Sequence, residues 1–96
     1  MKKLANKKYE IKISENQGAT TEDLIRMILN FPVDGGLQFK QFKERERILT
    51  QLDKVKDGVF EFEDEDVKNL KIIVTSFKWN KYSNDALNFM EEIEKL

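Results

Sequence analysis

A carboxylate-rich run, Glu61-Phe62-Glu63-Asp64-Glu65-Asp66, divides two patterns in the middle of this chain. Before it, apolar and polar residues alternate from Val59 to Phe62, which is typical of a strand; after it, apolar residues recur at helical spacing. Acidic side chains are favoured at helix starts, where backbone N–H groups lack partners and the macrodipole is positive. The run therefore predicts a strand that passes directly into a helix capped by Glu63 or Asp64.

Apolar periodicity predicts four helices in all. The first starts at Thr20 or Thr21 and ends at Asn30, because Phe31 precedes Pro32 and is pushed out of the helical region. The second spans about 37–55, the third follows the acidic run toward Trp79 and is expected to be the central one, and the last is capped by Ser83 or Asn84. The side chains expected to face inward are Phe39, Phe42, Ile48, Leu49, Leu52 and Val55 in the second helix, Val67, Leu70, Ile72, Ile73, Val74, Phe77 and Trp79 in the third, and Ala86, Leu87, Phe89, Met90, Ile93 and Leu96 in the last.

A basic segment near the N-terminus is the expected partner of the acidic strand. Tyr9, Ile11 and Ile13 alternate with charged residues, so residues 8–14 read as a strand with one buried face. Opposite charges across two strands help pairing modestly. The predicted fold is α+β, mostly α, with four helices and a two-stranded antiparallel sheet that joins residues 8–14 to 58–62. We expect one domain, 1–96, with residues 1–7 as a flexible basic N-terminus.

Composition excludes several function classes. Apolar residues are 40% and charged residues 36% of the 96, which predicts one thin core under a charged surface. The chain has no histidine and no cysteine, which removes the commonest general base, the commonest metal ligand and the thiol nucleophile. A net charge of −1 gives no global field for a polyanion. With neither a secretory signal nor a membrane-spanning stretch, we expect a cytoplasmic protein. The missing histidine and cysteine lead us to expect that it is not an enzyme.

The acidic residues could in principle hold a metal ion or act as paired catalytic carboxylates. In an extended segment Glu61, Glu63 and Glu65 point to one side and do not converge on a cleft, so a solvated strand edge and a helix cap explain them better than paired catalytic carboxylates. A calcium loop that begins at Asp53 lacks ligand oxygens at its third position and the required Glu at its twelfth. The sequence predicts no catalytic residue, metal site or cofactor.

Nucleic-acid binding is the main alternative function. Lys7 and Lys8 in the basic N-terminal segment, with Arg45 and Arg47 on the second helix, could contact phosphates. Glutamates alternate with the helical cations, a pattern more typical of a solvated helix face.

Protein binding has two candidate surfaces. One is the acidic edge made by Glu61, Glu63 and Glu65. The other surrounds Trp79 and Tyr82, because aromatic residues are enriched in binding hot spots, although both could equally cover the core with their polar ends in water.

Residues 35 to 93 resemble small proteins of about 100 residues encoded in phages and prophages. The resemblance lies in the layout of Pro32-x-x-Gly35-Gly36-Leu37, the charged helix from Phe42 to Leu49, the junction from Phe60 to Asp66, and then Leu70-Lys71 and Phe77-Lys78-Trp79. It implies a non-enzymatic accessory role in virion assembly or in regulation of another protein. Together with the thin core, for which association would add burial, this predicts a protein-interaction module that self-associates or docks on a protein partner and not on a membrane.

Overall fold

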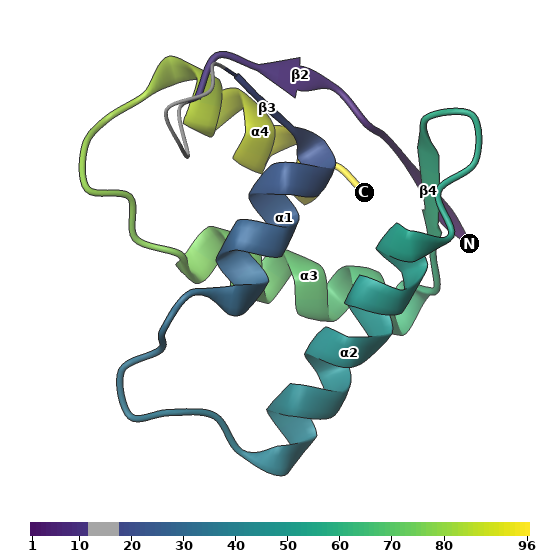
Figure 1. The fold of residues 1–96 in the computed structure, drawn as a ribbon, viewed down its shortest axis with the longest axis vertical. Helices are drawn as coiled ribbons and strands as arrows, with labels where there is room; N and C mark the ends of the chain where they lie inside the picture. Colours follow the sequence, from purple (N-terminus) through teal and green to yellow (C-terminus); the bar gives the residue numbers. More distant parts are fainter. Residues whose placement is uncertain (12–17) are drawn as a thin grey trace.

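The structure is a computed structural model and describes residues 1–11 and 18–96. In these ranges the chain forms four α-helices and two small antiparallel sheets of two strands each (Figure 1). The predicted class, α+β and mostly helical, is confirmed, and the second sheet is an addition to it. In chain order the elements are β1 (Lys2–Ala5), β2 (Lys8–Tyr9), β3 (Ala19–Thr20), α1 (Thr21–Asn30), α2 (Phe39–Asp53), β4 (Val59–Phe62), α3 (Asp64–Ser76) and α4 (Asn84–Glu94).

The acidic strand pairs with a different basic segment from the one predicted. Its partner is β1, with Lys3 opposite Glu61 and Leu4 opposite Phe60. Residues 8–14 are therefore not the partner: β2 pairs with β3, and residues 12–14 lie outside the described residues. Residues 2–5 and 8–12 are both rich in lysine, so charge complementarity alone could not predict which segment pairs with the acidic strand. Within residues 1–7, which were expected to be a flexible terminus, Lys2–Ala5 forms β1 and Leu4 is buried.

Backbone hydrogen bonds tie the chain after β1 to two other elements. The Asn6 N–H donates to the Gly58 carbonyl oxygen at 2.8 Å, beside β4. The Lys7 N–H donates to the Thr21 hydroxyl at 2.9 Å, and the Thr21 N–H donates to the Lys7 carbonyl oxygen at 2.8 Å. The start of α1 is thus fixed to the N-terminal segment as well as to its own cap.

Both ends of α1 and the start of α4 follow local sequence signals, as predicted, whereas α3 ends at Ser76, short of the predicted Trp79. Thr20 caps α1: its hydroxyl accepts from the Asp23 N–H at 3.2 Å, and the Asp23 carboxylate accepts from the Thr20 N–H at 3.0 Å. Helix α1 ends at Asn30, and Phe31 before Pro32 is extended. The Ser83 hydroxyl caps α4 by accepting from the Ala86 N–H at 3.2 Å. Glu63 occupies the N-cap position of α3 without a side-chain cap bond, and the acidic residues fill the first turn of the helix.

The buried apolar residues form one cluster, and α3 contacts α1, α2 and α4 around it. Helix α3 is therefore central, as expected, but its inward stripe is narrower than predicted because Ile72 is 57% exposed. In α2 only Ile48 and Leu52 are buried, whereas Phe39 and Phe42 are exposed at 75% and 59%. The prediction that these two phenylalanines face the core is wrong, because the first half of α2 lies beyond the elements that would cover it.

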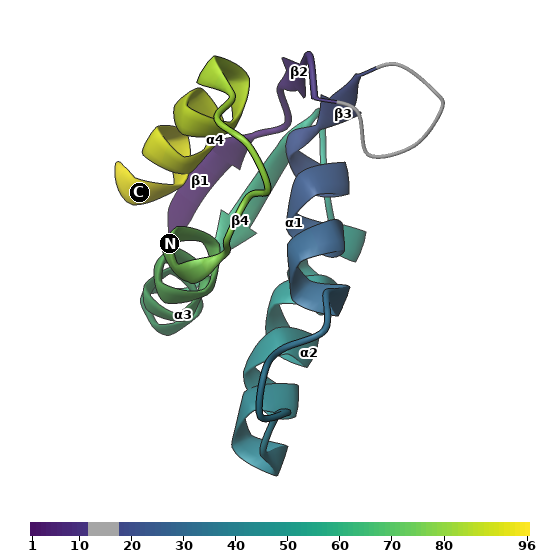
Figure 2. The same cartoon turned by 90° about the vertical axis from the view of Figure 1, so that its left-hand side faces the viewer.

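Residues 33–46 form a projection that we call the arm. It consists of the connection after α1 and the first half of α2, and it extends past the other helices in both views (Figures 1 and 2). The second half of α2 returns to the core beside β4 and α3.

Candidate interaction surface

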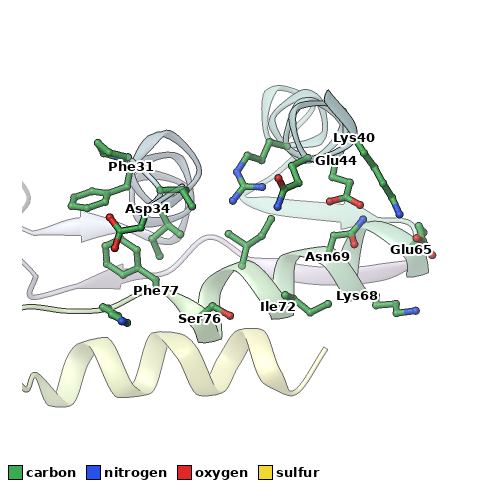
Figure 3. Close-up of a pocket in the computed structure, with 17 residues that line it drawn as sticks. Phe31, Asp34, Lys40, Glu44, Glu65, Lys68, Asn69, Ile72, Ser76 and Phe77 are labelled. Carbon is green, nitrogen blue, oxygen red and sulfur yellow. The ribbon is translucent and has the colours of Figure 1, made fainter. Parts of the chain in front are cut away.

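A groove of about 780 Å³ lies between α2 and α3. The segment after α1 bounds one end, where Phe31 and Phe77 lie together; the other end carries Lys40 and Glu44 from α2 across from α3 (Figure 3). The volume is in the range of ligand and peptide pockets. The lining residues are Ile28, Phe31, Pro32, Val33, Asp34, Lys40, Gln41, Glu44, Arg45, Glu65, Lys68, Asn69, Ile72, Ile73, Ser76, Phe77 and Lys78.

The groove exists because the chain turns away from the core after α1. Pro32 cannot follow a helical residue easily, so α1 stops, and the ring of Phe31 packs edge to face on that of Phe77 with centroids 5.2 Å apart. Gly35 and Gly36 have φ of 82° and 78°, a region that L side chains rarely adopt. Helix α2 then begins at the far end of this turn, so its first half stands apart from α3.

Charged side chains of both signs line the polar part of the groove. Helix α2 contributes Lys40, Glu44 and Arg45, and α3 contributes Glu65 and Lys68. The ion pairs among the described residues involve none of the five. The Arg45 Nε atom is buried without a hydrogen-bond partner in the described part of the chain. A buried donor of this kind favours any occupant of the groove that brings an acceptor.

Exposed apolar side chains gather on the arm and in the groove. Nine large apolar side chains are exposed among the described residues, and five of them belong to the arm or the groove. We call these five the apolar set: Phe31, Val33, Phe39, Phe42 and Ile72. Phe31, Val33 and Ile72 line the groove, while Phe39 and Phe42 do not and lie on the outer side of α2.

The predicted acidic edge is divided in the structure. Glu61 lies on β4 opposite Lys3, Glu63 is at the N-cap of α3, and Glu65 is in the first turn of that helix. All three are exposed, and only Glu65 lines the groove. Among residues 1–11 and 18–96, no group of three or more carboxylates is placed to hold a metal ion.

Trp79 and Tyr82, predicted as one aromatic surface, differ in burial. Trp79 is half-buried, with its ring edge to face on that of Phe77 at 5.1 Å and its indole N–H buried without a partner in the described residues. Tyr82 is 79% exposed, and its hydroxyl lies 3.4 Å from the Asn84 side-chain oxygen. Trp79 therefore supports the base of the groove through Phe77, and Tyr82 stands apart from it.

Two of the four cations proposed for nucleic acid already hold ion pairs. Lys7 Nζ lies 3.0 Å from a Glu92 carboxylate oxygen, and this hydrogen bond raises the pKa of Lys7. Arg47 Nε lies 2.8 Å from the buried carboxylate of Asp66, which raises the pKa of Arg47. Lys8 is exposed on β2.

The two predicted arginines also fail to make one basic face. Two residues apart on a helix, Arg45 and Arg47 point in directions about 160° apart. Arg45 lines the groove, whereas Arg47 is committed to Asp66 on the other side of α2. The structure does not bring the four candidate cations together as a phosphate-binding stripe.

The apolar set is what sequence reasoning missed. A signal was present: at about 100° per residue, Phe39 lies about 180° and Phe42 about 120° around the helix from Ile48, so neither lies on the same face as Ile48. The groove itself leaves no local signal, because it depends on how α2 is placed against α3.

No protein-family model, curated protein or solved structure matches this chain. In the described part of the chain, none of the helices has the length and apolar character needed to cross a membrane.

Proposed function

We propose that this chain is a non-enzymatic protein-interaction module that works through the arm and the groove. The observation that carries the proposal is the apolar set: five exposed apolar side chains concentrated around one projecting helix, beside a groove whose charges are unpaired within the described residues. Apolar patches larger than a few hundred Å² are uncommon on monomers and mark interaction surfaces.

Residue chemistry supports binding rather than catalysis. The chain contains no imidazole and no thiol. The groove offers apolar side chains, ammonium and guanidinium groups and scattered carboxylates, which suit recognition of another protein surface. The layout shared with small phage and prophage proteins supports an accessory role in assembly or regulation, acting in the cytoplasm.

Site-specific photo-crosslinking in the source cell tests this function. A benzophenone side chain in place of Phe42 is expected to give a discrete protein adduct, because Phe42 belongs to the proposed surface. The matched control carries the same group in place of Tyr82, which is exposed but does not line the groove, and gives no such adduct. The adduct must also disappear when Ile72→Asp is added. Equal cross-linking at both positions would contradict the proposal.

A further inference from the structure

Resting on the proposed function, we infer that the groove is covered by a second copy of this chain. In the two-fold pair that we propose, the arm of each copy lies in the groove of the other, with Phe39 and Phe42 packed against the partner's apolar groove wall. The pair is formed by two clasped arms.

One element of the chain, α2, carries both halves of the proposed contact. The outer side of α2 presents Phe39 and Phe42, while its inner side is a wall of the groove that contains Ile72. In the clasped pair, the inner sides of the two α2 helices face each other. The outer side of each α2 then faces α3 of the other copy, which is the opposite wall of that copy's groove. A surface that holds both a protruding and a receiving part is self-complementary, which is what a closed two-fold interface requires.

The charges on α2 also favour a second copy. The inner side of α2 carries Lys40, Glu44 and Arg45, which hold no ion pair among the described residues. In an antiparallel crossing of two α2 helices, Glu44 of each copy faces the cations of the other. The buried Arg45 Nε then gains an acceptor, while a uniformly acidic or basic partner would match only part of this wall.

The exposed area of the arm and the groove is sufficient for an interface with a second copy. A fully covered phenylalanine buries roughly 150–250 Å², so at their observed exposures the apolar set offers on the order of 500 Å². A standard interface uses about 800 Å² per partner, and the polar groove residues supply the remainder. The net charge of −1 opposes association only weakly. This area fits a reversible dimer better than a permanent one.

Analytical ultracentrifugation of the full chain from about 1 to about 500 µM tests the pair. The mass is expected to rise with concentration from 11.4 kDa toward twice that value. Phe42→Asp and Ile72→Asp are each expected to raise the dissociation constant at least tenfold, while the control Tyr82→Asp leaves it unchanged. All three positions are more than half exposed, so unchanged thermal melting confirms that each variant folds.

Mixing the two variants gives a sharper test. In a heterodimer of Phe42→Asp with Ile72→Asp, one of the two clasped contacts carries both substitutions and the other is intact. The mixture is therefore expected to associate more tightly than either variant alone. A partner contact that involved only one of the two sides would give no such recovery and would overturn the clasped arrangement.

The outcomes separate this inference from the proposed function. A mass of 11.4 kDa at every concentration, or a dimer indifferent to Phe42 and Ile72, overturns the second-copy inference. If a cross-link from Phe42 then joins a different protein and depends on Ile72, the proposed function stands and only the occupant was wrong. A monomer without a specific cross-link rejects both.

Discussion

Thr21 provides the most direct test of how the N-terminal segment is held. Its side chain is 1% exposed, and its hydroxyl accepts from the Lys7 N–H at 2.9 Å. The same hydroxyl lies 3.3 Å from the Ala5 carbonyl oxygen and 3.4 Å from that of Lys7, so it donates to one of them over a long distance. Thr21→Val keeps the shape and the β-branch but removes this hydroxyl.

The magnitude follows from which groups lose a partner. The Lys7 carbonyl keeps the Thr21 N–H as a donor at 2.8 Å, so the main loss is the acceptor for the Lys7 N–H. Leaving one such group unpaired costs about 1–3 kcal/mol, and we expect Thr21→Val to lower the free energy of unfolding by about 2 kcal/mol. Thr21→Ser keeps the hydroxyl and removes one buried methyl, for an expected loss of about 1 kcal/mol. In a chain of this size, 2 kcal/mol corresponds to roughly 10 °C in Tm.

Urea denaturation followed by circular dichroism measures these differences. The matched control is Thr50→Val: Thr50 is exposed, and its hydroxyl donates to the Glu46 carbonyl oxygen within the same helix at 2.9 Å. Threonine and valine have similar helix propensities, so the control is expected to stay within about 0.5 kcal/mol of the natural chain. If Thr21→Val were as stable as Thr50→Val, or more stable than Thr21→Ser, the reasoning would be refuted.

Three further outcomes are expected. Leu4→Ala should lower the free energy of unfolding by about 3 kcal/mol in urea denaturation, because Leu4 is buried in β1, whereas Leu87→Ala at an exposed site should cost less than half as much. Burial raises the pKa of Tyr9 above its ordinary 10.0, so the folded state holds the phenol proton more tightly than the unfolded state does. The neutral phenol therefore contributes to the free energy of unfolding in full below about pH 10, and this contribution is lost as pH rises through the folded pKa. In melts from about pH 9 to 11, Tyr9→Phe should therefore lose Tm less steeply than the natural chain, and Tyr82→Phe should match the natural chain. A fluorescent DNA duplex at low salt should show no saturable binding in an anisotropy titration, because two of the four candidate cations hold ion pairs; tight binding with a steep salt dependence would reverse this expectation.

The features that sequence reasoning predicted well are those encoded within one turn of chain. Thr20 and Ser83 cap helices through N–H groups three residues away, and Pro32 ends α1 through contact with its own neighbour. Each signal and its effect lie within a few residues, so no tertiary information is needed.

The strand partner and the site depend on contacts distant in sequence. Two basic segments competed for the acidic strand, and β1 pairs with it although it contributes only Leu4 to the buried cluster. The predicted site residue Glu65 does line the groove, but Glu61, Trp79 and Tyr82 do not, because their positions relative to α2 follow from packing rather than from spacing. Exposure of Phe39 and Phe42 follows both from their side of α2, which the sequence encodes, and from where α2 leaves the core, which it does not.

The first half of α2 has little packing of its own within the described residues, which favours a second copy that covers it. From Phe39 to Arg47 the helix contains no buried residue. Its local support includes the Gln38 N–H bonded to the Gln41 side chain at 2.8 Å, an exposed Lys43–Glu46 ion pair at 3.3 Å and Lys43 Nζ over the Phe39 ring at 5.8 Å. At its end, the Arg47–Asp66 ion pair ties this half of the helix to α3. Helical segments this short are marginal in water without tertiary packing, and exposed pairs add little. The arm therefore gains most from a surface that covers Phe39 and Phe42, and a partner that supplies it would stabilise the helix and bury the apolar set in the same step.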